Sequence, residues 1–387
     1  MSENPHTNTG PMAWESGALV ALVLTLASLG LATLYSASIH LAMGQSLSPG
    51  AYVRPQIQGL IIGIAVAALV SMTHYRRLER FAVPMQLIMM IVLAAMILPG
   101  TEWLAPSERG VRRWLDLRVV RIQPSEFAKL TLIIWTASAV IRKDKDLVTW
   151  RWGTLPLLAI WGVTAALIAL APSVSAAFIA AVLGGIVALA GGARWRHFFG
   201  IGVLAALPLW LFVTSADYRL RRLTAFRDPL QYADAEGYQV VQSLTAIGSG
   251  GLLGRGFGQS QMRTGFLPEP HNDFASSILA EEWGFMGVVI LVGLYMGIGL
   301  LSLRIAHRAP DRFGALLSVG CGALLVVPAF LHIAINLSML PATGVTLPFV
   351  SFGRSNLLVN CIAVGILLSI ATRSERKRTI LREVNGS

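Results

Sequence analysis

Long apolar runs, separated by short polar segments, recur along nearly the whole chain. Each run is long enough to cross a hydrocarbon core of ~30 Å, so the pattern predicts about ten membrane-spanning helices. The expected spans are residues 17–38, 56–72, 81–99, 124–141, 153–170, 174–191, 198–215, 275–303, 313–335 and 355–372. Because only helices and closed barrels satisfy the backbone in lipid, we predict an all-α, polytopic membrane protein.

The rest of the chain divides into two tails and three longer polar segments, 101–123, 216–273 and 336–354. We expect one membrane domain over residues 1–387, with a polar N-terminal tail at 1–13 and a basic C-terminal tail at 373–387. Composition agrees, with 55% hydrophobic and 13% charged residues and a mean hydropathy of +0.64. Cys321 and Cys361 fall inside apolar runs, which favours two core residues over a disulfide.

The distribution of Lys and Arg predicts the orientation. With both termini in the cytoplasm, the inner loops collect most of the cations, as the positive-inside rule requires. These cations are Arg76, Arg77, Arg80, Arg142, Lys143, Lys145, Arg151, Arg194, Arg196, Arg304, Arg308 and Arg312. The net charge of +11 therefore reflects topology and anionic lipid, and we expect no nucleic-acid partner.

Two outer loops break this rule, the segment 101–123 and the long extracytoplasmic loop 216–273. Their arginines are Arg109, Arg112, Arg113, Arg118 and Arg121 in the first, and Arg219, Arg221, Arg222, Arg227, Arg255 and Arg263 in the second. Arginine binds phosphate in a bidentate fork, so an anionic ligand at the outer membrane surface would explain them. The alternative is that they reach lipid headgroups.

The start of the span 124–141 combines a helix start signal with two ionisable residues. Pro124 suits the first turn of a helix, where the Glu126 carboxylate meets the positive end of the dipole. Glu126 and Lys129 are three residues apart, so they share a face and can pair. Lys129 then enters an apolar run, which marks either a functional residue or an ion pair tying the helix to a neighbour.

The long outer loop contains a glycine-rich stretch, residues 243–260. Such a stretch allows positive φ and close approach of the backbone to a ligand, or it forms a flexible lid. It lacks the Lys-Ser/Thr ending of a nucleotide-binding P-loop, which argues against ATP.

Carboxylates gather where the chain re-enters the membrane, at Glu269, Asp273, Glu281 and Glu282. A carboxylate at a partly desolvated boundary can have a raised pKa and act as a general base, but spacing alone favours Asp273 as the N-cap of the following helix. His271 beside these carboxylates is only a weak indication of a metal site. We therefore assign no metal ligands and leave open whether a divalent cation binds.

The segment Leu340–Ser355 cannot form a regular helix, because prolines and glycines interrupt it. Irregular backbone near a membrane is tolerated where it is buried in protein or lines a cavity. We expect Arg354 to face such a cavity, with Ser351 as a further candidate substrate contact. A re-entrant structural plug is the alternative.

These segments together resemble the SEDS family of bacterial cell-wall proteins over nearly the whole chain, from Leu34–Ser38 to the last helix. The strongest parts of the resemblance are Arg112–Trp114 with Gln123–Glu126 and Lys129, Leu267–Phe274 with Glu281–Gly284, and Leu347–Gly353. The stretch Gly254–Ser260 looks more like the division branch of the family than the elongation branch.

The resemblance implies ten transmembrane helices and a peptidoglycan glycosyltransferase that polymerises lipid II at the outer face of the cytoplasmic membrane. It implies a catalytic role for Asp273 and a class B penicillin-binding protein, a transpeptidase, as partner, alongside other membrane proteins of division or elongation. Lipid II carries a pyrophosphate, so Arg112, Arg113 and Arg263 are the candidate contacts. Supporting substrate contacts are expected from Glu126, Lys129, Glu269, His271, Glu282, Ser351 and Arg354.

The chain departs from the family pattern at three places. Ala171–Ser175 replaces Gln-Pro-Asp-x-Gly, Gly353–Asn356 replaces Gly-Gly-Ser-Ser, and Met262–Arg263 replaces Gln-Lys. The first change removes a carboxylate and a glycine, whereas the last keeps the charge. Two other functions therefore stay open, a flippase for lipid II and a non-catalytic membrane scaffold for a transpeptidase.

Overall fold

The computed structural model describes residues 13–385, apart from 102–104, 107–111, 117, 119–120, 144–145, 172, 201, 203–209, 211–213, 215–223 and 236. The side chains of residues 13 and 375–385 also lie outside the description. Residues 1–12 of the predicted tail, most of the expected span 198–215, and Arg109, Arg219, Arg221 and Arg222 therefore lie outside the described residues.

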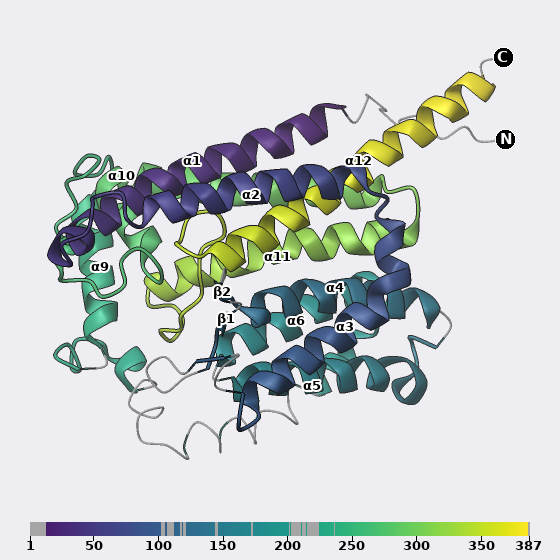
Figure 1. Cartoon of the computed structure of the whole chain (residues 1–387), viewed down its shortest axis with the longest axis horizontal. Helices are drawn as coiled ribbons and strands as arrows, with labels where there is room; N and C mark the ends of the chain where they lie inside the picture. The colour runs from purple at the N-terminus through teal and green to yellow at the C-terminus, as the bar shows by residue number, and fades with distance from the viewer. Residues whose placement is uncertain are drawn as a thin grey trace.

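The described chain is helical, with one short hairpin (Figure 1). The elements are α1 (Ala13–Gly44), α2 (Val53–Met72), α3 (Arg76–Ile97), β1 (Leu115–Asp116), β2 (Arg121–Ile122), α4 (Pro124–Arg142), α5 (Leu155–Leu170), α6 (Val174–Ala190), α9 (Tyr238–Gly250), α10 (Ala275–His307), α11 (Arg312–Asn336) and α12 (Arg354–Asn385). A π-helical turn, Trp150–Thr154, precedes α5, and a 3₁₀ turn covers Met262–Thr264.

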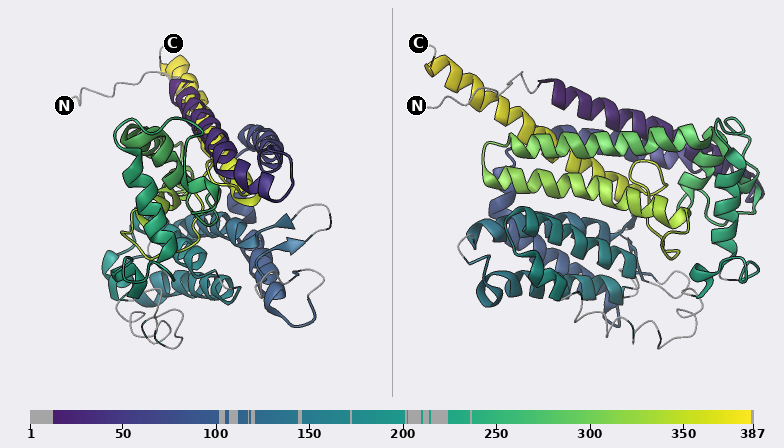
Figure 2. Two further views of the ribbon diagram at one scale, coloured as in Figure 1. Left: turned by 90° about the vertical axis from the view of Figure 1, so that its left-hand side faces the viewer. Right: turned by 180° about the vertical axis from the view of Figure 1, so that it is seen from behind.

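Every expected span except 198–215 corresponds to one of these helices. Among the described residues, 7 helices are long and apolar enough to cross a membrane, and α6 is a shorter apolar helix. The prediction of an all-α, polytopic membrane protein is confirmed. The segment 216–273, expected to be a long extracytoplasmic loop, contains the helix α9, which runs across one end of the bundle (Figures 1 and 2).

The long helices run side by side, with α11 and α12 most enclosed. α12 packs along α2, and α11 packs against α10, α4 and α6. In the most apolar stretches of α12 and α11, 72% and 61% of the residues are buried, against 17% in α2, so α2 lies at the periphery of the bundle. Close contacts use small residues, as membrane helices commonly do, for example Gly320 against Ile133. Cys321 and Cys361 are buried and free, as predicted.

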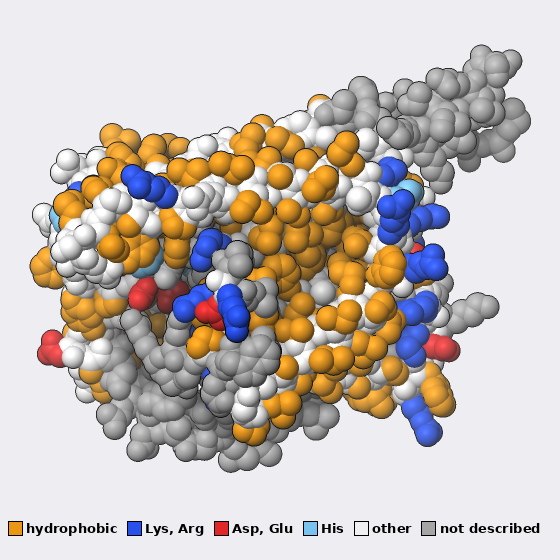
Figure 3. Space-filling model, viewed as in Figure 1, with side chains coloured by type: hydrophobic (Ala, Val, Ile, Leu, Met, Phe, Trp, Pro, Cys, Tyr) orange, Lys and Arg blue, Asp and Glu red, His pale blue; other side chains and the backbone are white. Residues whose placement is uncertain are grey.

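Cations gather at the end of the bundle where α2 meets α3 and α10 meets α11 (Figure 3). There Arg76 pairs with Asp311 at 2.9 Å, and Arg304 and Arg308 lie 2.6 and 2.8 Å from the buried Glu15 carboxylate. This end corresponds to the predicted cytoplasmic side. The hairpin, α9 and the segment before α10 lie at the opposite end (Figures 1 and 2).

Candidate active site

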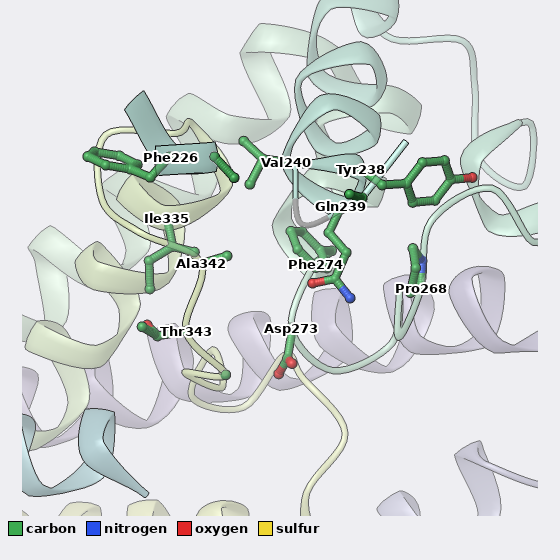
Figure 4. A pocket seen from close by; sticks show the side chains of 13 residues that line it. Phe226, Tyr238, Gln239, Val240, Pro268, Asp273, Phe274, Ile335, Ala342 and Thr343 are labelled. Carbon is green, nitrogen blue, oxygen red and sulfur yellow. The ribbon is translucent and has the colours of Figure 1, made fainter. Parts of the chain in front are cut away.

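A cavity of about 390 Å³ lies at the predicted outer end of the bundle, and Asp273 is one of the residues that line it (Figure 4). Its walls come from α9, the end of α11, the turn before α10 and the irregular segment 337–353. The lining residues are Ala225, Phe226, Ala235, Tyr238, Gln239, Val240, Pro268, Asp273, Phe274, Ile335, Ala342, Thr343 and Gly344. Among the described residues that line the cavity, Asp273 is the one carboxylate.

The Asp273 side chain is not a helix cap, although the spacing favoured that interpretation. α10 begins at Ala275 and its N-cap residue is Phe274, with no side-chain cap hydrogen bond. A capping side chain belongs to the residue directly before the helix, whereas Asp273 stands one residue too early. Its carboxylate therefore lies at the cavity wall, beside Gly344, instead of closing the helix.

The environment of Asp273 makes it a stronger base than an ordinary aspartate. The pKa of its carboxyl group is raised to about 6, chiefly by burial and in addition by the negative charge of Glu269, while Arg113 acts in the opposite direction. A carboxylate whose pKa lies near the working pH is well matched to general base catalysis.

The irregular segment 337–353 closes around the turn that carries Asp273. A Cβ added at Gly344 would lie 3.3 Å from Asp273 Oδ2, so the backbone passes directly beside the carboxylate. Ser351 Oγ donates to the Asn272 carbonyl at 2.6 Å and accepts from the Leu347 amide at 2.9 Å. The Ser351 hydroxyl thus holds the turn in place and is already engaged within the protein.

His271 lies behind the same turn rather than in the cavity. Its ring is 5 % exposed and packs 5.0 Å from the Tyr52 ring and 6.0 Å from the Phe352 ring. Burial lowers the pKa of His271, although Glu269 opposes this from 3.7 Å. Among the described residues no group of three His, Cys, Asp or Glu side chains could hold a metal ion.

A buried polar network that the sequence analysis missed joins the walls of the cavity. His332 of α11 donates from Nδ1 to the Val345 carbonyl at 2.6 Å, which leaves Nε2 to accept from Asn336 Nδ2 at 3.1 Å. Asn336 Nδ2 also donates to Ser276 Oγ of α10 at 2.6 Å, and the Asn336 carbonyl accepts from Ser243 Oγ of α9 at 2.8 Å. The helical spacing of His332 and Asn336 within an apolar run could have indicated it.

Glu126 and Lys129 form the ion pair that their spacing predicts. The two charged atoms are 2.8 Å apart and both side chains are buried. The other Glu126 oxygen accepts from Asn356 Nδ2 of α12 at 2.8 Å, and Asn356 in turn accepts from Asn360 at 2.7 Å. This arrangement ties the start of α4 to the start of α12.

Arg263 and Glu282 lie at the junction of α1 and α10. Arg263 donates to Ser36 Oγ of α1 at 3.1 Å and to the carbonyls of Ser260 and Gly258. The Ser36 hydroxyl donates to Glu282, which is buried. Arg263 is therefore fastened to its own loop and to α1, and its charge acts on Glu282 rather than on Asp273.

The remaining predicted residues lie nearer the surface. Arg112 donates to the Leu98 carbonyl at 3.2 Å, and the exposed Glu269 accepts from Asn272 at 3.0 Å. Arg354 is exposed as the first residue of α12, with its aliphatic stem against Gly59 of α2. The structure thus brings Asp273, Glu269 and Arg113 within electrostatic reach of one another and places Arg263, Glu282, Glu126 and Lys129 elsewhere.

Fold and site together define a polytopic membrane protein with a carboxylate-centred cavity at one membrane surface. The family described as "Cell cycle protein", FtsW/RodA/SpoVE, matches residues 17–376. The chain belongs to this family.

Its relatives and structural neighbours match along most of their length. It is 34% identical to a probable peptidoglycan glycosyltransferase FtsW of Trichlorobacter lovleyi, over 91% of this chain and 92% of the relative. It is 31% identical to stage V sporulation protein E of Bacillus subtilis, over 92% and 96%. A chain from a peptidoglycan synthase complex, 26% identical, superposes with a TM-score of 0.75 over 92% of this chain and 96% of the other. RodA of Thermus thermophilus, 27% identical, gives 0.65 over 92% and 95%.

Proposed function

We propose that this chain is a peptidoglycan glycosyltransferase that polymerises lipid II into glycan strands at the outer face of the cytoplasmic membrane. The observation that carries the proposal is the buried Asp273, which lines the cavity and whose carboxyl group has a pKa raised to about 6. Relatives named as probable peptidoglycan glycosyltransferases FtsW support this activity and favour a role in cell division over elongation.

The reaction needs a general base and cationic groups that stabilise the negative charge of the leaving pyrophosphate. A hydroxyl of the acceptor sugar attacks the anomeric carbon of the donor, and the bond from that carbon to the pyrophosphate oxygen breaks. Asp273 accepts the hydroxyl proton, and lipid pyrophosphate leaves with the bonding electrons. Proton transfer to a positioned carboxylate contributes typically ~10²–10⁴-fold in rate.

Three arginines are the proposed contacts of the leaving pyrophosphate. Arg113 acts electrostatically on Asp273, and Arg112 lies beside it on the same loop. Arg354 is an exposed cation at the start of α12. Guanidinium groups bind phosphate oxygens in pairs and stabilise charge that develops in the transition state.

Several predicted substrate residues are better explained as supports for these groups. Ser351 and His271 hold the turn of Asp273, while Glu126 and Lys129 fix the start of α12 beside Arg354. Arg263 and Glu282 fix the outer loop to α1. We assign these residues to positioning instead of direct contact with lipid II.

The proposal includes a setting in the cell. We infer that both termini are cytoplasmic, that residues 216–273 are outside, and that the partner is a class B penicillin-binding protein with other membrane proteins of the division machinery. The cations at the end formed by the α2–α3 and α10–α11 turns support the orientation. A structural neighbour described as part of a peptidoglycan synthase complex that coordinates polymerization and crosslinking supports the partnership.

Reconstitution separates this proposal from a flippase and from a scaffold. Purified protein in liposomes is supplied with fluorescent lipid II, with and without its transpeptidase, and both glycan chains and lipid II crossing are measured. We expect glycan chains and no net crossing. If lipid II crosses the membrane and no polymer forms, the protein is a flippase. If an active partner is present and neither polymer nor crossing is detected, the protein is a scaffold.

A further inference from the structure

Gln56 is a buried polar side chain on a helix that otherwise lies at the periphery of the bundle. Gln56 and Gly63 are the two buried residues of α2, every residue of which is described. Gln56 is 2% exposed, whereas Gln58, two positions further along the same helix, is an exposed residue. A polar group taken out of solvent is normally retained by hydrogen bonds, so the partners of Gln56 indicate its role.

The carboxamide of Gln56 binds the backbone of the irregular segment 337–353 at two points. Its Nε2 donates to the Ser351 carbonyl at 3.2 Å, and its Oε1 accepts from the Gly353 amide at 3.3 Å. A carboxamide carries a donor and an acceptor on one rigid group, whereas a carboxylate offers acceptors and an ammonium group offers donors. Glutamine is therefore matched to a stretch of backbone that presents a carbonyl and, two residues later, an amide.

The same stretch of backbone also holds the turn that carries Asp273. The Phe352 amide donates to the His271 carbonyl at 3.0 Å, beside the hydrogen bond from Ser351 Oγ to the next carbonyl of the turn at 2.6 Å. Phe352 lies between the two backbone groups that Gln56 binds. The hydrogen bonds of Gln56 and those to the turn therefore act on the same three residues, and a displacement of one set is passed on to the other.

A second contact from the start of α2 reaches the same turn. The ring of Tyr52, the N-cap residue of α2, lies 5.0 Å from the His271 ring and 5.8 Å from the Phe352 ring. Residues four apart in a helix share a face, so Tyr52 and Gln56 approach the turn together. α2 also packs along α12, which begins directly after the irregular segment (Figure 1). The first turn of α2 thus supports the turn of Asp273 from outside the cavity.

We propose that Gln56 is a positioning residue for the proposed reaction: its carboxamide holds residues 351–353 in place, and through them it holds Asp273 at the cavity wall. Gln56 is not among the described residues that line the cavity, so it acts without touching lipid II. Loss of the carboxamide should therefore slow the chemical step and leave the binding of lipid II unchanged. This role rests on the proposed function.

A loosened turn should also move the acid limb of the rate profile. Burial is the main cause of the raised pKa of Asp273, so a turn that admits water lets this pKa fall towards its ordinary value. The charged groups that act on Asp273, Glu269 and Arg113, are unchanged when Gln56 is replaced. The base is then deprotonated at lower pH, and the acid limb should move to lower pH. A change that reduced only the amount of folded protein would scale the rate equally at every pH.

Kinetics of the full-length protein, reconstituted with its transpeptidase and labelled lipid II, test this role. Gln56→Met removes both hydrogen bonds at similar side-chain volume, and Gln56→Asn keeps the carboxamide on a stem one methylene shorter. Gln58→Met, at the exposed position of the same helix, is the matched control. We expect kcat to fall roughly tenfold to a hundredfold in both Gln56 variants, as for a misplaced catalytic group, and to stay at the wild-type value in Gln58→Met. The KM for lipid II should stay within about twofold of the wild-type value.

Three kinetic results contradict the proposal. The first is an unchanged kcat with an unshifted acid limb in a folded Gln56 variant. The second is a higher KM at unchanged kcat, because Gln56 would then contact the substrate. The third is an equal loss of rate in Gln58→Met, because the effect would then belong to the helix as a whole.

Hydrogen exchange measured by mass spectrometry tests the contact without relying on activity. The Gly353 amide donates to Gln56, so it should exchange faster in Gln56→Met and Gln56→Asn than in the wild type and Gln58→Met. Unaltered exchange at this amide overturns the positioning role. A wild type that forms no glycan chains would refute the proposed function instead, and the exchange rates would still decide whether Gln56 holds the segment.

Discussion

The hydroxyl of Ser351 donates a 2.6 Å hydrogen bond to the carbonyl of Asn272, the residue directly before Asp273. Two segments about 80 positions apart in the sequence therefore share one buried contact at the floor of the turn. A Gly344 Cβ would lie 3.3 Å from the Asp273 carboxylate, which shows how closely the same segment approaches the reactive group.

Removal of this hydroxyl should misplace Asp273 without removing it. Ser351→Ala leaves the buried Asn272 carbonyl and Leu347 amide without their partner, a loss of ~1–3 kcal/mol. We expect the rate of polymerisation to fall at least tenfold while lipid II binding stays near normal. Ser71→Ala, at a partly exposed serine that bonds to its own helix, is the control. An unchanged rate in Ser351→Ala would show that the turn holds its geometry without this contact.

A double mutant separates the two interpretations of Lys129. Lys129→Met leaves the Glu126 carboxylate buried with one partner fewer, which should cost about 3–5 kcal/mol of stability. Glu126→Gln combined with Lys129→Met removes both charges, so thermal stability in detergent should recover substantially. If activity recovers as well, the pair is structural. Recovered stability with lost activity would instead assign Lys129 to the substrate, against our proposal.

The charge of Arg113 should shift the pH dependence of the reaction. Arg113 lowers the pKa of Asp273, so Arg113→Ala raises that pKa further above its ordinary value. A base works when it is deprotonated, and the acid limb of the rate profile should therefore move to higher pH. Arg113→Lys should restore the limb, and Arg112→Ala is the control because Arg112 is not among the groups that shift this pKa. If the acid limb of the rate profile stays at the same pH in Arg113→Ala, Arg113 does not affect the pKa of the catalytic base.

The orientation can be tested in intact cells. Asp234 lies in the long loop and is exposed, so Asp234→Cys should react with a membrane-impermeant maleimide before lysis. Labelling that requires lysis would invert the topology and place the Asp273 cavity on the wrong side for the proposed reaction. The buried Cys321 and Cys361 should remain unlabelled in both conditions.

The sequence was sufficient to predict features that depend on neighbouring residues, such as membrane spans and ion pairs within one helix. Hydropathy located the spans because the bilayer imposes a length on each helix, and the spacing of Glu126 and Lys129 predicted their pair. α9 was missed because its buried positions, Val240, Ser243, Ala246 and Gly250, mix polar and small residues and stop short of a membrane span.

Contacts between segments that lie far apart in the sequence could not be predicted from it. Asp273 is not a cap because the N-cap residue of α10 is Phe274, and the spacing of residues in the sequence does not place a helix start to within one residue. The hydrogen bond of Arg263 to Ser36 of α1 joins residues 227 positions apart. The sequence alone therefore did not distinguish Arg263 from the other arginines of the outer loops. His332 and Asn336 became recognisable as a network once α9 and α10 supplied the other partners.

The most direct test of the central claim compares wild type and Asp273→Asn, reconstituted at equal amounts with the same transpeptidase and supplied with labelled lipid II. The measurement is the initial rate of glycan formation, read from chain lengths on a gel between pH 5 and 8. We predict that the wild-type rate rises through about pH 6, the pKa of Asp273, and that the variant binds its partner but polymerises ~10²–10⁴-fold more slowly. Long glycan chains from Asp273→Asn at the wild-type rate would contradict the account.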